Sequence, residues 1–393
     1  MFQNPQGLLT LFLSAISHLI AAGLMTALAN WAGLISWRRA SAAHWTERAR
    51  LLWPVRCTAG INIFLIPVIL NLAHRGLFPE SAQGWIADGV ASFLGALLGC
   101  YPFDREIYPQ LDFRNWRHQI IAGWGIRFGI WAALLAAGVL MPESFGPKML
   151  IVAGCYLALH FAIQWGLFLK YLRLVKFLTP ADARLQQIVR VTAARMNATV
   201  RATWQLGGSL ATAFAFPTTR EVAFSHRLLE ICTDEEVSAI CAHELAHLKE
   251  SKIVLAGRLL GSMSFLPLIF INPSIHQFGV AGIFLPYLGM IVIAQFARWL
   301  SQRMERRADQ LALTEQANEG VYACALEKLY QENQMPAVNV NNKQTHPHLY
   351  DRMLAAGITP DYPRPTKPKR LTWFGWLYAL LFGLLIGLAV SKG

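Results

Sequence analysis

Charged residues are scarce in this chain. Only 15% of its 393 residues are Asp, Glu, Lys or Arg, whereas 54% are hydrophobic. A typical soluble domain carries about 25% charged residues. The composition therefore excludes an ordinary soluble protein of this length and favours an integral membrane protein.

Cysteine is also sparse, and its spacing excludes a disulfide framework. The chain has six Cys, and none of them forms a C-x-x-C pair. We therefore expect free thiols. Cys241 precedes the motif described below by two residues, which could make it redox-sensitive, but we favour a small buried apolar residue.

Acidic residues are fewer than basic ones, and the formal net charge is +12. A basic chain can bind nucleic acid, but here the Lys and Arg residues lie between long apolar runs. That distribution is typical of membrane topology, and no basic and aromatic patch stands apart from it. We expect contact with a lipid bilayer and no nucleic-acid partner.

Eight apolar stretches predict membrane-spanning helices, each of which needs about 20 residues. They lie at about 8–35, 57–73, 84–101, 119–141, 149–169, 259–275, 278–297 and 372–390. The first is too long for a signal-peptide core and lacks a preceding positive region, so we interpret it as a retained span. Asn272-Pro273 suggests that the sixth and seventh stretches form a hairpin.

The connections between these stretches alternate in positive charge. Lys and Arg are frequent in 37–56, 102–118 and 170–201 but rare in 74–83 and 142–148. Positive connections stay in the cytoplasm, which puts the N-terminus outside and segment 170–252 in the cytoplasm. The hairpin returns the chain to the cytoplasm at Arg298, and the last stretch leaves the C-terminus outside.

Polar side chains also interrupt the predicted spans: Asp88, Arg127, His160 and Gln164. Such groups usually face a bundle interior or a water-filled cavity. One interpretation is a polar chamber within the bundle. The other is that they pair for structural reasons, or that the span boundaries are misplaced.

The cytoplasmic segment contains the sequence HELAH, residues 243–247. On a helix His243 and His247 share one face and can bind one zinc ion, while Glu244 can act as general base on a zinc-bound water. Residues 233–236, Thr-Asp-Glu-Glu, form a capping box that predicts a helix from 234 to about 251. The alternative is an accidental match.

A catalytic zinc site needs a third protein ligand. In segment 296–313, Glu305 and Asp309 lie four residues apart on one helical face. Glu305 can complete a His₂Glu site, and Asp309 can accept a hydrogen bond from a ligand histidine. The alternative is a solvated charged helix in which neighbouring arginines pair with these acids.

The rest of the soluble segment predicts a small mixed domain. Residues 180–197 predict a helix, and three short strands are expected at 199–205, 210–216 and 220–225, separated by Gly and Pro. The predicted fold class is an α-helical multi-pass membrane protein with a small α+β zincin-type metallopeptidase domain at its cytoplasmic face. The expected division is an N-terminal bundle at 1–170, peptidase halves at 171–258 and 298–360, a membrane hairpin at 259–297, and a linker with the last span at 361–393.

Several motifs together resemble the membrane zinc endopeptidases of the CAAX prenyl protease type I, HtpX and Oma group. HELAH follows an acidic pair, ERRAD (305–309) follows about sixty residues later beyond a hairpin, and Thr345-His346-Pro347 precedes Arg352. The motifs cover roughly 205–355. Five spans before HELAH and two between the motifs resemble the prenyl-protease branch most, although a span after 370 departs from its pattern.

This resemblance implies a role for each matching residue. It implies one zinc ion per chain held by His243, His247 and Glu305, with Glu244 as catalytic base and Asp309 orienting a ligand histidine. His346 would help to stabilise the tetrahedral oxyanion, and Arg352 would order the nearby acids. Without the resemblance, His346 would be an ordinary loop residue.

The resemblance also implies a substrate-binding edge strand at 210–216, to which a peptide would add by backbone pairing. Relatives often carry Asn-Ala-Phe there, whereas this chain has Thr212, Ala213 and Phe214. The shorter hydroxyl of Thr212 departs from that pattern at the position that would contact the substrate backbone.

The sequence thus predicts a zinc-dependent integral-membrane endopeptidase that acts at the cytoplasmic face on membrane-associated, misfolded or lipidated proteins. We favour a bacterial inner membrane over an endomembrane. One alternative is a signal-transducing relative with a single regulator as substrate, but no external loop is long enough for a sensor domain. The other is a non-catalytic membrane scaffold with an accidental HExxH.

Overall fold

The computed structural model describes residues 5–77, 84–340, 347–373, 375–377 and 380. The chain divides into two compact units. The first comprises Met1–Phe113, Gln334–Val340 and Tyr362–Gly393, and the second comprises Arg114–Asn333 and Asn341–Asp361. The five-part division expected from the sequence stays a prediction.

The first unit is built of helices that pack closely through small residues. Its elements are α1 (Pro5–Gly33), α2 (Ile35–Arg39), α3 (Trp45–Leu77), α4 (Trp85–Leu98) and α5 (Tyr101–Ile107). Helix α1 packs against α4, and α3 packs against both. A Cβ atom at Gly95 would overlap the backbone of Leu19, so glycine permits this close approach of α4 to α1.

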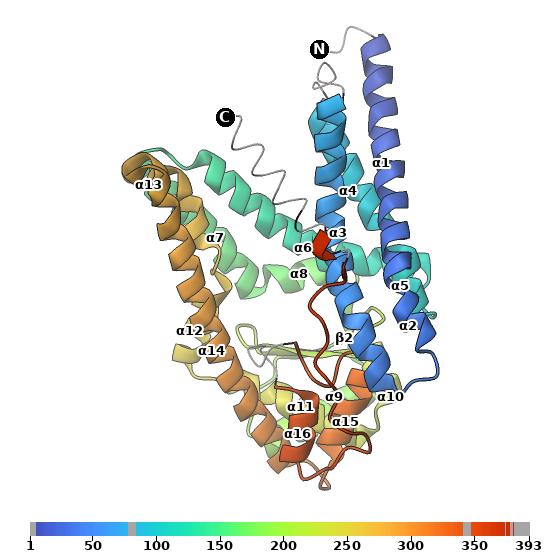
Figure 1. Cartoon of the computed structure of the whole chain (residues 1–393). Coiled ribbons are helices and arrows are strands. Elements are labelled where there is room, and N and C mark those ends of the chain that lie inside the picture. The colour runs from blue at the N-terminus through green and yellow to red at the C-terminus, as the bar shows by residue number, and fades with distance from the viewer. Residues whose placement is uncertain (1–4, 78–83, 341–346, 374, 378–379, 381–393) are drawn as a thin grey trace. The chain divides into compact units, whose positions relative to one another are not determined.

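The second unit contains its own apolar helices (Figure 1). They are α6 (Phe113–Leu140), α7 (Pro147–Ala162), a π-helical turn η2 (Ile163–Leu167), α8 (Phe168–Leu174), α12 (Lys252–Ser262), η3 (Leu266–Phe270), α13 (Ile271–Phe278), η4 (Gly279–Ile283) and α14 (Phe284–Glu315). Gly166 has φ 115°, a conformation that favours glycine, and kinks the chain between α7 and α8. Helix α14 runs from the apolar α13 end of the unit down to α11 and α16 (Figure 1).

Among the described residues, six helices are long and apolar enough to cross a membrane. They cover Gly7–Arg39, Trp45–His74, Trp85–Ile107, Phe113–Leu140, Pro147–Leu174 and Leu266–Glu315. The expected stretch at 372–390 lies mostly outside the described residues. Between α12 and α14, which pack against each other, the chain forms short helical pieces from 266 to 283. Pro273 lies in the first turn of α13, where its missing N–H costs no hydrogen bond.

Within the described residues, four strands form one mixed sheet: β1 (Leu178–Pro180), β2 (Ala202–Leu206), β3 (Ala213–Phe216) and β4 (Glu221–Ser225). Their order is β1-β2-β4-β3, in which β2 and β4 are parallel and the outer pairs are antiparallel. The three expected strands are present, and β1, only three residues long, is an additional one. Strand β3 lies at an edge of the sheet.

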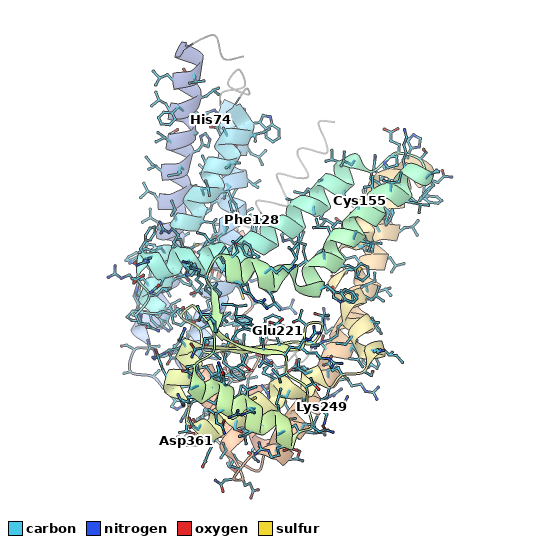
Figure 2. The ribbon with its side chains drawn as sticks, turned by 180° about the vertical axis from the view of Figure 1, so that it is seen from behind. His74, Phe128, Cys155, Glu221, Lys249 and Asp361 are labelled. Carbon is cyan, nitrogen blue, oxygen red and sulfur yellow. The ribbon has the colours of Figure 1, made fainter. Side chains whose placement is uncertain are left out.

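In the described part of the second unit, the remaining helices are α9 (Ala183–Arg195), α10 (His226–Ile231), α11 (Asp234–Leu248), α15 (Val321–Glu332) and α16 (Leu349–Ala355). Helix α11 packs against α9, α14, α15 and β3, and its Val237 and Leu245 are fully buried. Figure 2 shows Glu221 on the sheet and Lys249 just after α11. Since α11 contacts elements on several sides, its position in the unit is closely defined.

The capping box at the start of α11 is formed as the sequence predicts. Thr233 Oγ1 accepts from the backbone N–H of Glu236 at 3.3 Å, and Glu236 Oε2 accepts from the N–H of Thr233 at 2.9 Å. Lys328 on α15 donates to the same carboxylate. The cap therefore defines where α11 begins and ties it to α15.

We expect Thr233→Ala to destabilise the first turn of α11 by about 1 kcal/mol, because one helix-end N–H loses its acceptor. Amide hydrogen exchange in that turn should accelerate about fivefold, measured by mass spectrometry on the full chain. Thr314→Ala is the control, since its exposed hydroxyl bonds only within α14. Equal exchange in both variants would contradict the prediction.

Candidate metal centre

Two helices that are far apart in the sequence meet at a group of buried side chains that could hold a metal ion. His243 and His247 lie one turn apart on α11, and Glu305 lies on α14. His243 Nε2 is 3.4 Å from Glu305 Oε2, and His247 Nε2 is 3.6 Å from Glu305 Oε1. Ligands at about 2.0 Å from a tetrahedral zinc ion are about 3.3 Å apart. The three side chains therefore fit a metal ion, and all are buried.

The second nitrogen of His243 faces protein acceptors. Its Nδ1 is 2.7 Å from the Tyr322 hydroxyl and 3.1 Å from Asp309 Oδ1. Tyr322 donates its own proton to Asp309 at 2.8 Å, so its oxygen can accept from His243 Nδ1–H. This network favours the tautomer whose Nε2 lone pair points at Glu305, as a metal ligand requires.

Burial and neighbouring charges act in opposite directions on the pKa of His243. Burial alone lowers the pKa of His243, but its hydrogen bonds to Asp309 and Glu305 and the nearby charge of Glu244 outweigh that effect and raise the pKa to about 9. Burial raises the pKa of the Tyr322 phenol well above its usual range, so Tyr322 stays neutral. A metal ion at Nε2 must displace a proton from His243.

Arg352 on α16 holds this network from the other side. Its guanidinium donates from Nε to Asp309 Oδ2 at 2.9 Å, from a terminal nitrogen to Oδ1 at 2.5 Å, and to the Tyr322 oxygen at 2.8 Å. The Arg352 side chain is only 8% exposed, which makes such a two-pronged ion pair strong and directional. Asp309 is thereby oriented toward His243.

His247 has a separate support. Its Nδ1 donates to Glu250 Oε1 at 2.8 Å, and Arg258 on α12 donates to both oxygens of Glu250 at 3.2 Å. The Glu250 side chain is 2% exposed, so Arg258 compensates a charge that is costly to bury alone. Both imidazoles thus present Nε2 to Glu305 and Nδ1 to a carboxylate, a pattern typical of metal-binding histidines.

The remaining expected site residues lie in different settings. Glu244 is partly exposed beside the ligand pair. Thr212 precedes β3, and its backbone exchanges hydrogen bonds with Ser225, whereas Ala213 and Phe214 belong to the edge strand itself. His346 lies outside the described residues, so its expected role is not tested.

Sequence analysis missed Glu250, Arg258 and Tyr322. Glu250 follows His247 by three residues, a spacing that places it on the same side of the chain as His247 and that could have been noticed. Arg258 and Tyr322 have no such local signal. Cys241 behaves as favoured above: it is fully buried, and burial raises the pKa of its thiol.

Residues 180–357 match the model of peptidase family M48. The matched segment runs from β1 to just beyond α16 and contains every side chain of the network described above. No curated protein matches the chain. The M48 match supports a metallopeptidase, in agreement with a His-His-Glu group that fits a metal ion.

We expect Glu305→Ala to abolish stoichiometric metal binding, because two imidazoles alone make a weak site. Metal content of the purified full chain, measured by elemental mass spectrometry, should fall from about one zinc per chain to near zero. Glu315→Ala on the same helix is the control, since its carboxylate pairs with Arg195 and not with His243 or His247. Full metal retention in Glu305→Ala would show that the site is misassigned.

We expect Glu250→Ala to weaken metal binding about 10- to 100-fold, because His247 loses the acceptor that orients it. Competition with a chelator of known affinity measures the change. Glu230→Ala is the matched control: it removes an exposed carboxylate that pairs with Arg227. An unchanged affinity in Glu250→Ala would mean that Glu250 only neutralises Arg258.

Proposed function

We propose that this protein is a zinc-dependent endopeptidase of the membrane, with its site at the cytoplasmic face. The observation that supports this most is the pair of imidazoles whose Nε2 atoms both face Glu305, within the segment that matches peptidase family M48. The candidate spans support the membrane location. The charge alternation of the connections supports the cytoplasmic orientation.

In the proposed reaction, water adds to the scissile carbonyl and the C–N bond breaks. Zinc, when bound by His243, His247 and Glu305, supplies the Lewis acid that polarises the carbonyl and acidifies the water. Glu244 takes one proton from the attacking water and delivers it to the leaving amine. Its partial exposure suits this role, because substrate and water must reach its carboxylate.

Four further residues have positioning roles in this proposal. Asp309 and Glu250 hold the two ligand histidines, and Arg352 and Tyr322 keep Asp309 in place. These groups fix the positions of the ligand side chains before substrate arrives. Such preorganisation is a main source of catalytic rate enhancement. His346 is assigned to stabilisation of the oxyanion.

The substrate is proposed to lie along β3 as an additional strand. An edge strand has unpaired backbone groups that an extended peptide can use, and β3 packs directly against α11. Ala213 and Phe214 belong to this strand, and Phe214 is 47% exposed. Because the site adjoins candidate spans in the sequence, the proposed substrates are membrane-associated, misfolded or lipidated proteins.

We expect Glu244→Gln to keep the metal and lose proteolysis. The amide cannot accept the proton of the attacking water, and general-base catalysis typically contributes about 10²- to 10⁴-fold. The test uses purified full chain in detergent, with β-casein as an unfolded probe and elemental analysis of the metal. Glu235→Gln, an exposed residue on the same helix, is the control.

Two outcomes would count against the proposal. Cleavage by Glu244→Gln at the wild-type rate would refute the assigned base. Absence of cleavage by the wild type, with one metal ion bound, would favour a non-catalytic metal protein. Comparison of membrane proteins from cells producing wild type or Glu244→Gln would then identify natural substrates as chains that accumulate in the variant.

A further inference from the structure

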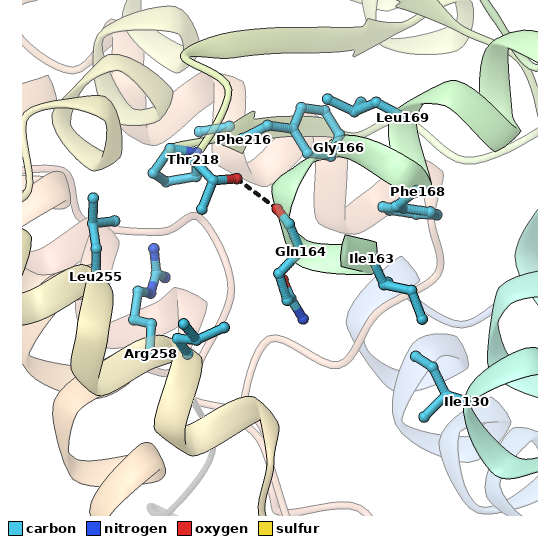
Figure 3. A pocket seen from close by; sticks show the side chains of 13 residues that line it. Ile130, Ile163, Gln164, Gly166, Phe168, Leu169, Phe216, Thr218, Leu255 and Arg258 are labelled. Carbon is cyan, nitrogen blue, oxygen red and sulfur yellow. Dashed lines mark hydrogen bonds between the residues drawn. The ribbon is translucent and has the colours of Figure 1, made fainter. Parts of the chain in front are cut away.

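A cavity of about 430 Å³ lies in the second unit, beyond the ligands described above (Figure 3). Its walls come from α6, the η2 turn and the start of α8, the end of β3 and the turn that follows it, and one side of α12. Most of the lining is apolar, including Phe168, Phe216, Leu255 and Leu259. Its volume falls within the range of about 300–1,000 Å³ that is usual for ligand sites.

The cavity lies at the strand proposed to bind substrate. Ala215 and Phe216 belong to β3, and Pro217 and Thr218 continue the same wall. Among the strands of the described residues, β3 has a partner, β4, on one side only. Side chains of a peptide added to an edge strand alternate between the two faces of the sheet. One side chain of a bound peptide is therefore placed to enter the cavity.

A short chain of contacts links the cavity to the metal ligands. Arg258 lines the cavity and donates to both oxygens of Glu250, which accepts from Nδ1 of His247. The cavity is thus two hydrogen bonds from a ligand of the proposed reaction centre. A side chain bound there belongs to a residue close to the scissile bond.

The charged and hydroxyl side chains in the wall, Arg258 and Thr218, have partners within the protein, and the neutral amide of Gln164 is a further polar group that lines it. These groups define the chemistry of the occupant. The charge of Arg258 is balanced by the buried carboxylate of Glu250, and the Thr218 hydroxyl donates to the backbone carbonyl of Gln164 at 2.7 Å (Figure 3). An anionic ligand would have to compete with Glu250 for Arg258. A neutral apolar group needs no such exchange and gains by leaving water.

We propose that this cavity is a specificity pocket for one large apolar side chain, such as Leu, Met or Phe, of a peptide paired with β3. This rests on the proposed peptidase function. The rival occupant is a lipid acyl chain, because Ile130 and Ile163 in the wall come from candidate spans. The Arg258–Glu250 pair, the wall formed by β3 and the connection to His247 favour the peptide.

The test compares cleavage-site profiles of full-length variants in detergent. The probe is a synthetic peptide library in which Ala, Leu or Phe stands at each position in turn, and cuts are located by mass spectrometry. Leu259→Trp fills the cavity from α12. Leu260→Trp is the matched control, since Leu260 is the next residue of the same helix, is 47% exposed and does not line the cavity.

Wild type and Leu260→Trp should prefer Leu or Phe over Ala about tenfold or more at one position near the cut. Leu259→Trp should lose this preference at that position alone, while it retains its metal and still cuts peptides with Ala there. If Leu259→Trp fails to fold, as judged by its metal content, Leu255→Trp narrows the cavity from the preceding turn of α12 and should give the same result.

An unchanged preference in the cavity variants that fold would overturn the proposal. So would wild type without any apolar preference. Loss of a co-purifying lipid in Leu259→Trp, with the cleavage profile unchanged, would assign the cavity to lipid instead. Failure of the proposed function looks different: wild type would cut no peptide in the library at all, and the pocket proposal would fall with it.

Discussion

The approach of Glu305 to two imidazoles is the constraint on which the second unit depends. It requires α11 and α14 to pack so that a carboxylate from one lies between two histidines of the other. Three buried ligand side chains without a metal would be costly, because burial disfavours charge. The surrounding side chains offset that cost. Each imidazole lies with its Nδ1 close to a carboxylate, and each of those carboxylates forms an ion pair with an arginine.

The hydrogen-bonded groups that hold His243 and those that hold His247 come from different helices, so they connect the site to different parts of the chain. The His243 support runs through Asp309 and Tyr322 to Arg352, which joins α11, α14, α15 and α16. The His247 support runs through Glu250 to Arg258 on α12, which leads toward the apolar helices. The first closes the site on the α15 and α16 side, and the second relates the site to the cavity beside β3.

The sheet sets the direction in which a peptide paired with β3 would run past the site. Strand β3 lies at the edge, packs against α11, and ends at the cavity wall. A peptide paired with β3 would therefore pass the metal ligands and present a side chain to the cavity in one register. Because a shift by one residue turns every side chain to the other face of a strand, the cavity would, in the proposed function, select which peptide bond is placed for hydrolysis.

Local sequence signals determined much of this arrangement. The capping box and HELAH spacing predicted α11, the i, i+4 acids predicted Glu305, and strand and turn composition predicted β2, β3 and β4. Helix caps and side-chain periodicity depend on neighbours within a few residues, so the sequence displays them directly. The apolar stretches likewise predicted candidate spans, although the chain between 266 and 283 folds into short pieces that hydropathy does not resolve.

Only the tertiary structure decided which distant groups support the ligands. Tyr322 lies 79 positions from His243, and Arg352 lies 43 from Asp309, and no periodicity connects such pairs. The same holds for Arg258, whose partner Glu250 is clear only once α12 is packed beside the end of α11. It also holds for the cavity, whose walls come from separate segments. The sequence by itself predicted the His243–His247 pair, because their spacing is local, and it indicated Glu305 through the i, i+4 acids of a separate helix. Their orientation, and the pocket beside them, were decided by packing, because they arise between elements and not within them.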